Sequence, residues 1–197
     1  MRTLIVLACA IAAGPESSAQ VAVNVSAGAR YSGTLVHDSI VAPFDVRPGV
    51  APAFAVSFAL APQRGWSGEA LLDISWSTLS RHDADGATQS LGGLGALSFA
   101  VALRRQLPAG FGARLTAGGL AYLTAEESGV FREGAEVFPL LGVGVDYGPL
   151  FAPWLTLEAR ADAHSFITRA LRDVGFTERR IVPRIALLLR ADLTRLW

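Results

Sequence analysis

The chain has 197 residues, and its 17 basic and 17 acidic side chains give a formal net charge of zero. That balance argues against nucleic acid as a partner, because binding to phosphates needs an excess of positive charge. The mean hydropathy of +0.39 is high for a soluble protein. No run of about 18 apolar residues follows the N-terminal region, so transmembrane helices do not account for this hydropathy.

Residues 1–19 have the three parts of a secretory signal peptide. Arg2 supplies the positive charge, an apolar stretch follows, and Ser17-Ser18-Ala19 provides a small-residue cleavage site. Cys9 is the only cysteine and would leave with the signal peptide, so no disulfide is expected. The residues before Cys9 also faintly resemble a lipobox, which is the alternative interpretation. We therefore expect one mature domain, residues 20–197.

Most of that domain alternates between apolar residues and polar or very small ones. Val21, Val23 and Val25, for example, alternate with Asn24 and Ser26. A period of two predicts β-strands, because successive side chains point to opposite faces. The predicted strands are 20–33, 49–61, 66–78, 90–105, 111–124, 136–147, 154–165 and 181–197.

The connections between these strands alternate in length. The longer ones are expected at about 34–48, 79–89, 125–135 and 166–180, with short turns between them. One face of the strands has almost no charge, which suits lipid because a charge at the bilayer midplane costs about 2–4 kcal/mol. The pattern predicts an all-β, eight-stranded antiparallel up-and-down transmembrane barrel. A soluble lipocalin-like barrel or β-sandwich is the alternative.

The C-terminal segment carries the most specific resemblance. The alternating pattern typical of a barrel-assembly signal is formed by Leu189, Ala191, Leu193 and the terminal Trp197. Arg195 departs from this pattern. The whole mature chain resembles the small bacterial outer-membrane barrels of the OmpA transmembrane-domain, OmpX and OmpW type. This resemblance implies a monomer in the cell outer membrane, surrounded by outer-membrane lipid and lipopolysaccharide and assembled by the barrel-assembly machinery. It implies neither a cofactor nor nucleic acid.

Charged residues gather on the face that would line the lumen. We expect an ion network there, because an unpaired buried charge is costly. Its expected members are Glu69, Asp73, Arg104, Arg114, Asp146, Glu158, Arg160, Asp162, Arg184, Arg190 and Asp192. Arg30 also stands at a strand position whose side chain is expected to point into the lumen; we call this inward parity. Seven of these residues fall toward the periplasmic end, Arg190 and Asp192 among them, and one connected network is expected to join the other five: Glu69, Arg104, Arg114, Asp146 and Glu158.

The extracellular half of the lumen is expected to be apolar. Its candidate pocket residues are Leu94, Leu120, Tyr122, Phe138 and Leu140, opposite the small Ala51 and Ala53. Large residues facing alanine either interlock or leave a gap. A gap would resemble the apolar pocket of OmpW-like proteins and would suit a small hydrophobic molecule.

No convincing catalytic or metal site emerges from the sequence. His164 shares inward parity with Asp162, but Ser165 points the other way, and Ser80 and His82 share a face only if residues 79–89 stay extended. The sequence therefore favours a non-enzymatic outer-membrane barrel with a filled, ion-paired lumen and a structural or surface-interaction role. The alternative is a narrow channel or carrier for a small hydrophobic molecule, and a lipid A-modifying enzyme is more remote.

The last long loop is rich in basic residues. Its arginines are Arg169, Arg172, Arg179 and Arg180. Because arginine pairs well with phosphate, this loop is the part of the chain that could contact lipopolysaccharide. Such a charge run is more often only a solvated face.

Overall fold

A computed structural model describes residues 21–38, 43–124, 127–132 and 134–195. The expected signal peptide and Trp197 lie outside these residues. Among the residues that the structure describes, no helix is both long enough and apolar enough to span a membrane.

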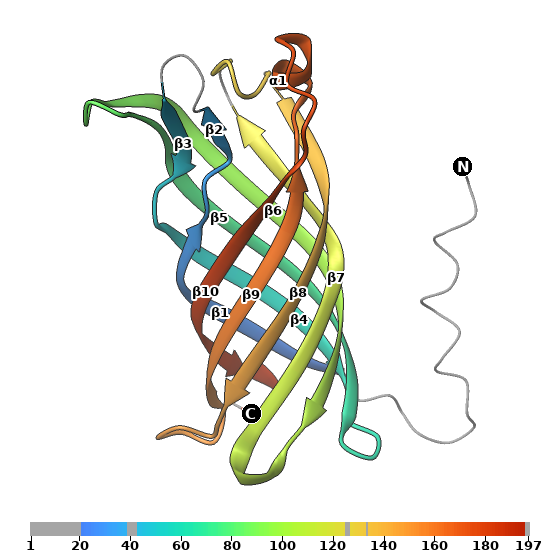
Figure 1. The fold of residues 1–197 in the computed structure, drawn as a ribbon. Helices are drawn as coiled ribbons and strands as arrows, with labels where there is room; N and C mark the ends of the chain where they lie inside the picture. The colour runs from blue at the N-terminus through green and yellow to red at the C-terminus, as the bar shows by residue number, and fades with distance from the viewer. Residues whose placement is uncertain (1–20, 39–42, 125–126, 133, 196–197) are drawn as a thin grey trace, which may run out of the picture.

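Eight long antiparallel strands close into a barrel (Figure 1). They are β1 (Val21–Ser32), β4 (Ala51–Leu60), β5 (Trp66–Asp83), β6 (Thr88–Gln106), β7 (Phe111–Thr124), β8 (Gly134–Tyr147), β9 (Leu155–Phe166) and β10 (Arg180–Asp192). Each strand pairs with its neighbour around the ring, and the pairing of β1 with β10 closes it. The predicted eight-stranded up-and-down barrel is confirmed.

The exterior of the barrel is apolar along the strands. Val137, Leu141 and Ile181 are 64%, 66% and 66% exposed, although soluble proteins seldom expose so many large aliphatic side chains together. The alternate residues point inward and are buried, as in β10, where exposure alternates from Ile181 to Arg190. An apolar outer wall around a polar interior is the pattern of a membrane-spanning barrel.

The two ends of the barrel differ. Short turns join the strands at the lower end in Figure 1, and longer segments join them at the upper end. Exposed aromatic rings lie near both ends, with Tyr31 and Trp76 toward the upper end and Phe111 against Tyr147 at the lower one. Such rings suit the two interfaces of a bilayer.

The upper end contains more strand than the sequence predicted. β5 and β6 continue upward to a turn at residues 84–87, so most of the loop expected at 79–89 is a hairpin. Two further strands, β2 (Val36–Asp38) and β3 (Phe44–Pro48), form where a loop was expected, and β3 pairs with β5. The expected loops were wrong because β3 pairs with the lengthened β5 and β2 pairs with β3, and local alternation does not reveal such pairings.

The last strand ends earlier than predicted. β10 stops at Asp192, and Leu193–Arg195 forms a single 3-10 turn called η2. Asp192 Oδ1 accepts hydrogen bonds from the Thr194 backbone nitrogen at 3.0 Å and from its hydroxyl at 2.5 Å, which turns the chain. Leu189 and Ala191 therefore lie on the final strand, whereas Leu193 does not.

Candidate functional site

Ion pairs cross the lower half of the lumen, above a cavity of about 250 Å³ at its lower end. Arg114 contacts Glu69 at 2.9 Å and also pairs with Glu158, while Arg190 contacts Glu69 from the other side at 3.2 Å. Arg114 and Glu158 are buried, and their side chains come from β7 and β9, which lie on either side of β8. The contacts therefore tie non-adjacent strands together across the lumen.

The same chain of contacts continues upward. Arg160 lies 2.5 Å from Glu158 and 3.5 Å from Asp73, and Asp73 pairs through both carboxylate oxygens with Arg30. We call this connected set the ion chain. Its members are Arg190, Glu69, Arg114, Glu158, Arg160, Asp73 and Arg30. Alternating charges give most of its members partners on two sides, which offsets the cost of their burial.

Arg104 and Asp146 form a separate pair at the lower end. Their closest contact is 2.5 Å, with a second hydrogen bond at 2.9 Å from Arg104 Nε. Both side chains occupy space beside Gly112, where a Cβ atom would collide with them. Among the described residues no ion pair joins them to the ion chain. The single network expected for five residues is thus two units.

Three expected members of the network lie outside both units. The three guanidinium nitrogens of Arg184, which is 1% exposed, form no hydrogen bond with the described residues. Asp162 is directly opposite on β9, but its carboxylate leans over Gly142 on the far side, where a Cβ would overlap it. Asp192 instead caps the turn at Thr194.

The upper half of the lumen is filled by apolar side chains. All five expected pocket residues belong to one buried cluster and are between 0% and 6% exposed: Leu94, Leu120, Tyr122, Phe138 and Leu140. Phe131 and Phe166 join them, with ring centroids 5.5 Å and 6.1 Å from that of Tyr122. We call this packed cluster the upper plug.

The sequence could not distinguish a pocket from interlocking side chains in this half of the lumen, and the upper plug is the interlocking case. Phe131 comes from the segment after β7, which does not follow strand alternation, so its inward position was not predicted. Ala53 does not face the five residues in this cluster and packs instead with Ala186 and Leu188. Large residues therefore interlock with loop residues rather than standing opposite alanine.

A short helix covers the upper plug. Thr168 caps α1 (Arg169–Asp173) by accepting a hydrogen bond from the Leu171 nitrogen at 3.2 Å, and its hydroxyl donates to the Val130 carbonyl. Thr168 and Leu171 are buried. The segments after β7 and β9 are thus fixed to each other above the lumen.

Polar groups on the outer face of the upper sheet resemble parts of a hydrolase site. Because β5 stays extended, Ser80 and His82 share one face, and Asp45 lies opposite His82. Yet Asp45 bonds His37 at 2.7 Å, and His82 lies 3.1 Å from the Thr88 hydroxyl. Among the described side chains, Ser80, His82 and Asp45 do not form the hydrogen bonds of a triad.

The buried His164 forms no catalytic site with the other described residues but packs in the lumen. His164 Nε2 lies 3.2 Å from the Tyr122 hydroxyl, within hydrogen-bond distance, while its ring packs among Phe138 and Phe166. His164 therefore belongs to the upper plug rather than to a site with Asp162. The described residues contain no cluster of three or more His, Cys, Asp or Glu side chains able to hold a metal ion.

No protein family and no curated protein matches the chain, but several solved structures do. Ail of Yersinia pestis, in complex with sucrose octasulfate, is 11% identical, with 88% of this chain and 97% of Ail covered and a TM-score of 0.49. OprG of Pseudomonas aeruginosa is 9% identical, with 88% and 94% covered and a TM-score of 0.46. Neisserial surface protein A is 11% identical, with 87% and 97% covered and a TM-score of 0.43.

The fold and its interior define a membrane-spanning β-barrel with an occupied lumen. Small bacterial outer-membrane barrels, the class that the sequence resembles, are among its structural neighbours.

Proposed function

We propose that this protein is a monomeric barrel of the bacterial outer membrane with a closed lumen and a structural or surface-interaction role. The observation that carries the proposal is a lipid-compatible exterior around an interior that side chains cross at two levels. The ion chain crosses the lower half, above a cavity of about 250 Å³ at the lower end, and the upper plug fills the upper half.

The occupied interior favours this role over a channel or carrier. Eight strands enclose a space just wide enough for side chains or one small ligand. Here the expected pocket residues are in contact with one another and with Phe131. A carrier would need this upper plug to rearrange before an apolar molecule could enter.

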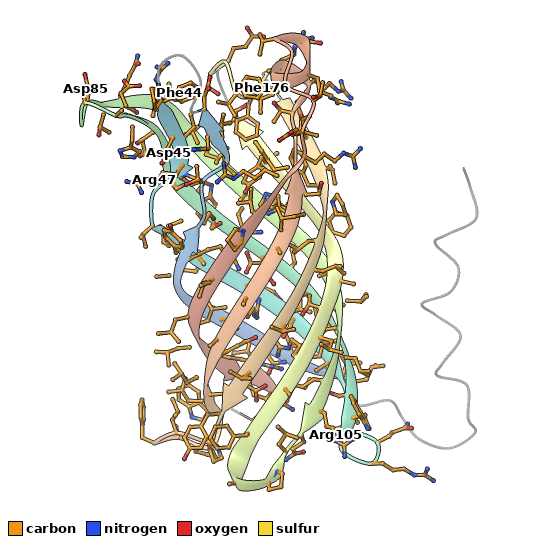
Figure 2. All side chains as sticks on the ribbon, viewed as in Figure 1. Phe44, Asp45, Arg47, Asp85, Arg105 and Phe176 are labelled. Carbon is orange, nitrogen blue, oxygen red and sulfur yellow. The ribbon has the colours of Figure 1, made fainter. Side chains whose placement is uncertain are left out.

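The upper end supplies the surface for interaction. The hairpin of β5 and β6, with Asp85 at its tip, extends above the exposed aromatic rings and is joined by β3, which carries Asp45 and Arg47 (Figure 2). We infer that this end faces the cell exterior, because the longer connections lie there and outer-membrane barrels keep short turns in the periplasm. The barrel-assembly machinery is the expected partner during insertion.

Fractionation and planar-bilayer recording test the proposal together. The protein should appear in the outer-membrane fraction as a band whose mobility changes on heating, and the folded barrel should show no stepwise conductance. Recovery as a soluble periplasmic protein would contradict the location. Discrete channel openings, or saturable uptake of an apolar probe into the lumen, would instead favour the channel or carrier.

A further inference from the structure

A groove runs down the outer wall at the upper end, between β8 and β9 and beneath α1. It has a volume of about 420 Å³. The residues that matter in it are Val137, Pro139, Ile167, Arg169, Arg172 and Arg179. We call it the β8–β9 groove.

The groove forms because the two strands separate. The β8–β9 ladder ends at Leu140 and His164, although β8 begins as early as Gly134 and β9 runs on to Phe166. Pro139 is the next residue of β8 and has no backbone N–H to continue the ladder. Above this point each strand pairs only with its other neighbour, β7 or β10.

The lower part of the groove belongs to the lipid-facing wall. Val137 and Pro139 are exposed and share the outward parity of Leu141 and Val143 farther down β8. An acyl chain lying along β8 would therefore enter the groove without leaving apolar surface.

The upper part of the groove carries three arginines that form no ion pair with any described acid. In the described residues, the guanidinium groups of Arg169, Arg172 and Arg179 form no ion pair or hydrogen bond, and all three residues are exposed. Asp173, the nearest acid on α1, is paired with Arg132. Positive charge is thus available at the edge of the apolar wall.

Two further acids lie close to these arginines. Glu136 lines the groove, but both its carboxylate oxygens accept from the Arg169 backbone nitrogen, at 3.1 and 3.2 Å. Glu178 is exposed and adjoins Arg179 in the chain. The three arginines outnumber these two carboxylates, and Glu136 also anchors α1 to β8.

The helix α1, which carries Arg169 and Arg172, is well anchored. Thr168 and Leu171 are buried, and Thr168 binds both the Val130 carbonyl and the Leu171 nitrogen. A site whose side chains stand on an ordered element loses less entropy when a ligand binds.

We propose that the β8–β9 groove binds a phosphorylated lipid of the outer leaflet, of the lipid A type. Arg169, Arg172 and Arg179 would bind its phosphate, and an acyl chain would lie against Val137 and Pro139. Guanidinium groups bind phosphate oxygens through paired hydrogen bonds. The apolar wall below them selects a lipid over a free phosphate. This inference rests on the proposed outer-membrane location and orientation.

The test measures binding of lipid A to the folded full-length barrel in a neutral detergent by native mass spectrometry. Dephosphorylated lipid A is the matched ligand, and inorganic phosphate is the competitor. The double variant Arg172→Glu/Arg179→Glu should bind lipid A more weakly by about tenfold or more, because a hydrogen bond to a charged group contributes about a decade in affinity.

The control variant is Arg64→Glu/Arg105→Glu. It changes the net charge equally, at exposed residues of the lower end that do not line the groove. It should bind lipid A like the wild type, and millimolar phosphate should not displace the lipid. Equal binding of dephosphorylated lipid A, equal loss in both variants, or displacement by phosphate would each overturn the proposal.

Heat-dependent mobility of the same samples separates the two proposals. A wild type that folds and inserts but shows no preference for phosphorylated lipid contradicts the groove alone. A wild type that does not insert contradicts the proposed function, and the groove assignment falls with it. If the Arg172/Arg179 variant does not fold, Arg172→Gln with Arg179→Gln supplies the same comparison with smaller charge change.

Discussion

Arg114 and Arg184 show how differently two buried arginines can be placed in one lumen. Arg114 is in contact with Glu69 and Glu158, whereas the guanidinium nitrogens of Arg184 form no hydrogen bond with the described residues. Both side chains are almost fully buried. The first arginine connects three strands, and the second imposes a desolvation cost without a matching ion pair.

Replacing each of them by methionine should therefore have opposite effects on stability. Arg114→Met should lower the free energy of unfolding by about 3–5 kcal/mol, because it leaves two buried carboxylates without their shared cation. Arg184→Met should leave the unfolding midpoint unchanged or raise it. Urea unfolding of the barrel in lipid vesicles, followed by mobility on heating, measures both. A loss of similar size in both variants would show that Arg184 has a stabilising partner.

Sequence parity predicted which residues face the lumen, but it could not predict their partners. Parity is fixed by the two-residue repeat of a strand, so Glu69, Arg114 and Glu158 were placed inward correctly. Partner choice depends on rotamer and free space. Asp162 leans over Gly142 rather than toward Arg184, and no local pattern in either strand signals that choice.

At the scale of strands, the contact between β1 and β10 is the critical one, since it closes the ring. Gly28 lies opposite Leu188 in this ladder, and a Cβ atom added to it would overlap the Leu187 carbonyl oxygen. The backbones approach closely there only because Gly28 has no side chain. Gly93 on β6 has open space around its own Cβ position.

Gly28→Ala should therefore impair closure, whereas Gly93→Ala should be tolerated. Overpacking of this kind costs about 1–3 kcal/mol, so the Gly28 variant should refold in a smaller yield and unfold at lower denaturant. The fraction that migrates as a folded band without heating measures the yield. Equal yields for both variants would mean that β10 can shift to accommodate the added methyl group.

Strands were predicted well where they face lipid and poorly where they rise above it. Lipid requires an uninterrupted outward apolar row, which fixed the parity of β4, β6, β8 and β10 from the sequence. β2 and β3 lack that requirement: β3 forms by pairing with the extended β5, and β2 forms by pairing with β3. The turn at Asp192 likewise depends on a side-chain hydrogen bond that alternation does not reveal.

On the scale of the whole molecule, the barrel is polarised along its axis. The ion chain and the short turns lie toward one end, while the upper plug, the extended hairpin and the arginines of the β8–β9 groove lie toward the other. Figure 2 shows Arg105 at the lower end and Phe44 and Phe176 at the upper one. If the upper end faces the cell exterior, residues at that end should be labelled on intact cells and residues at the lower end should not.

Single cysteines can report that orientation, because the mature chain would contain none of its own. Thr177→Cys, in the exposed segment before β10, should react with a membrane-impermeant maleimide on intact cells. Gln63→Cys, in the exposed turn between β4 and β5, should react only after the outer membrane is permeabilised. Phe99→Cys lies on the outer wall of β6. Lipid should protect it both in intact cells and after permeabilisation, and it should react only after solubilisation and unfolding, since an aqueous reagent does not enter the hydrocarbon region.

Labelling of Gln63→Cys but not Thr177→Cys on intact cells would invert the orientation and remove the β8–β9 groove from the outer leaflet. Labelling of Phe99→Cys on intact cells would place the apolar wall in water and contradict membrane insertion itself.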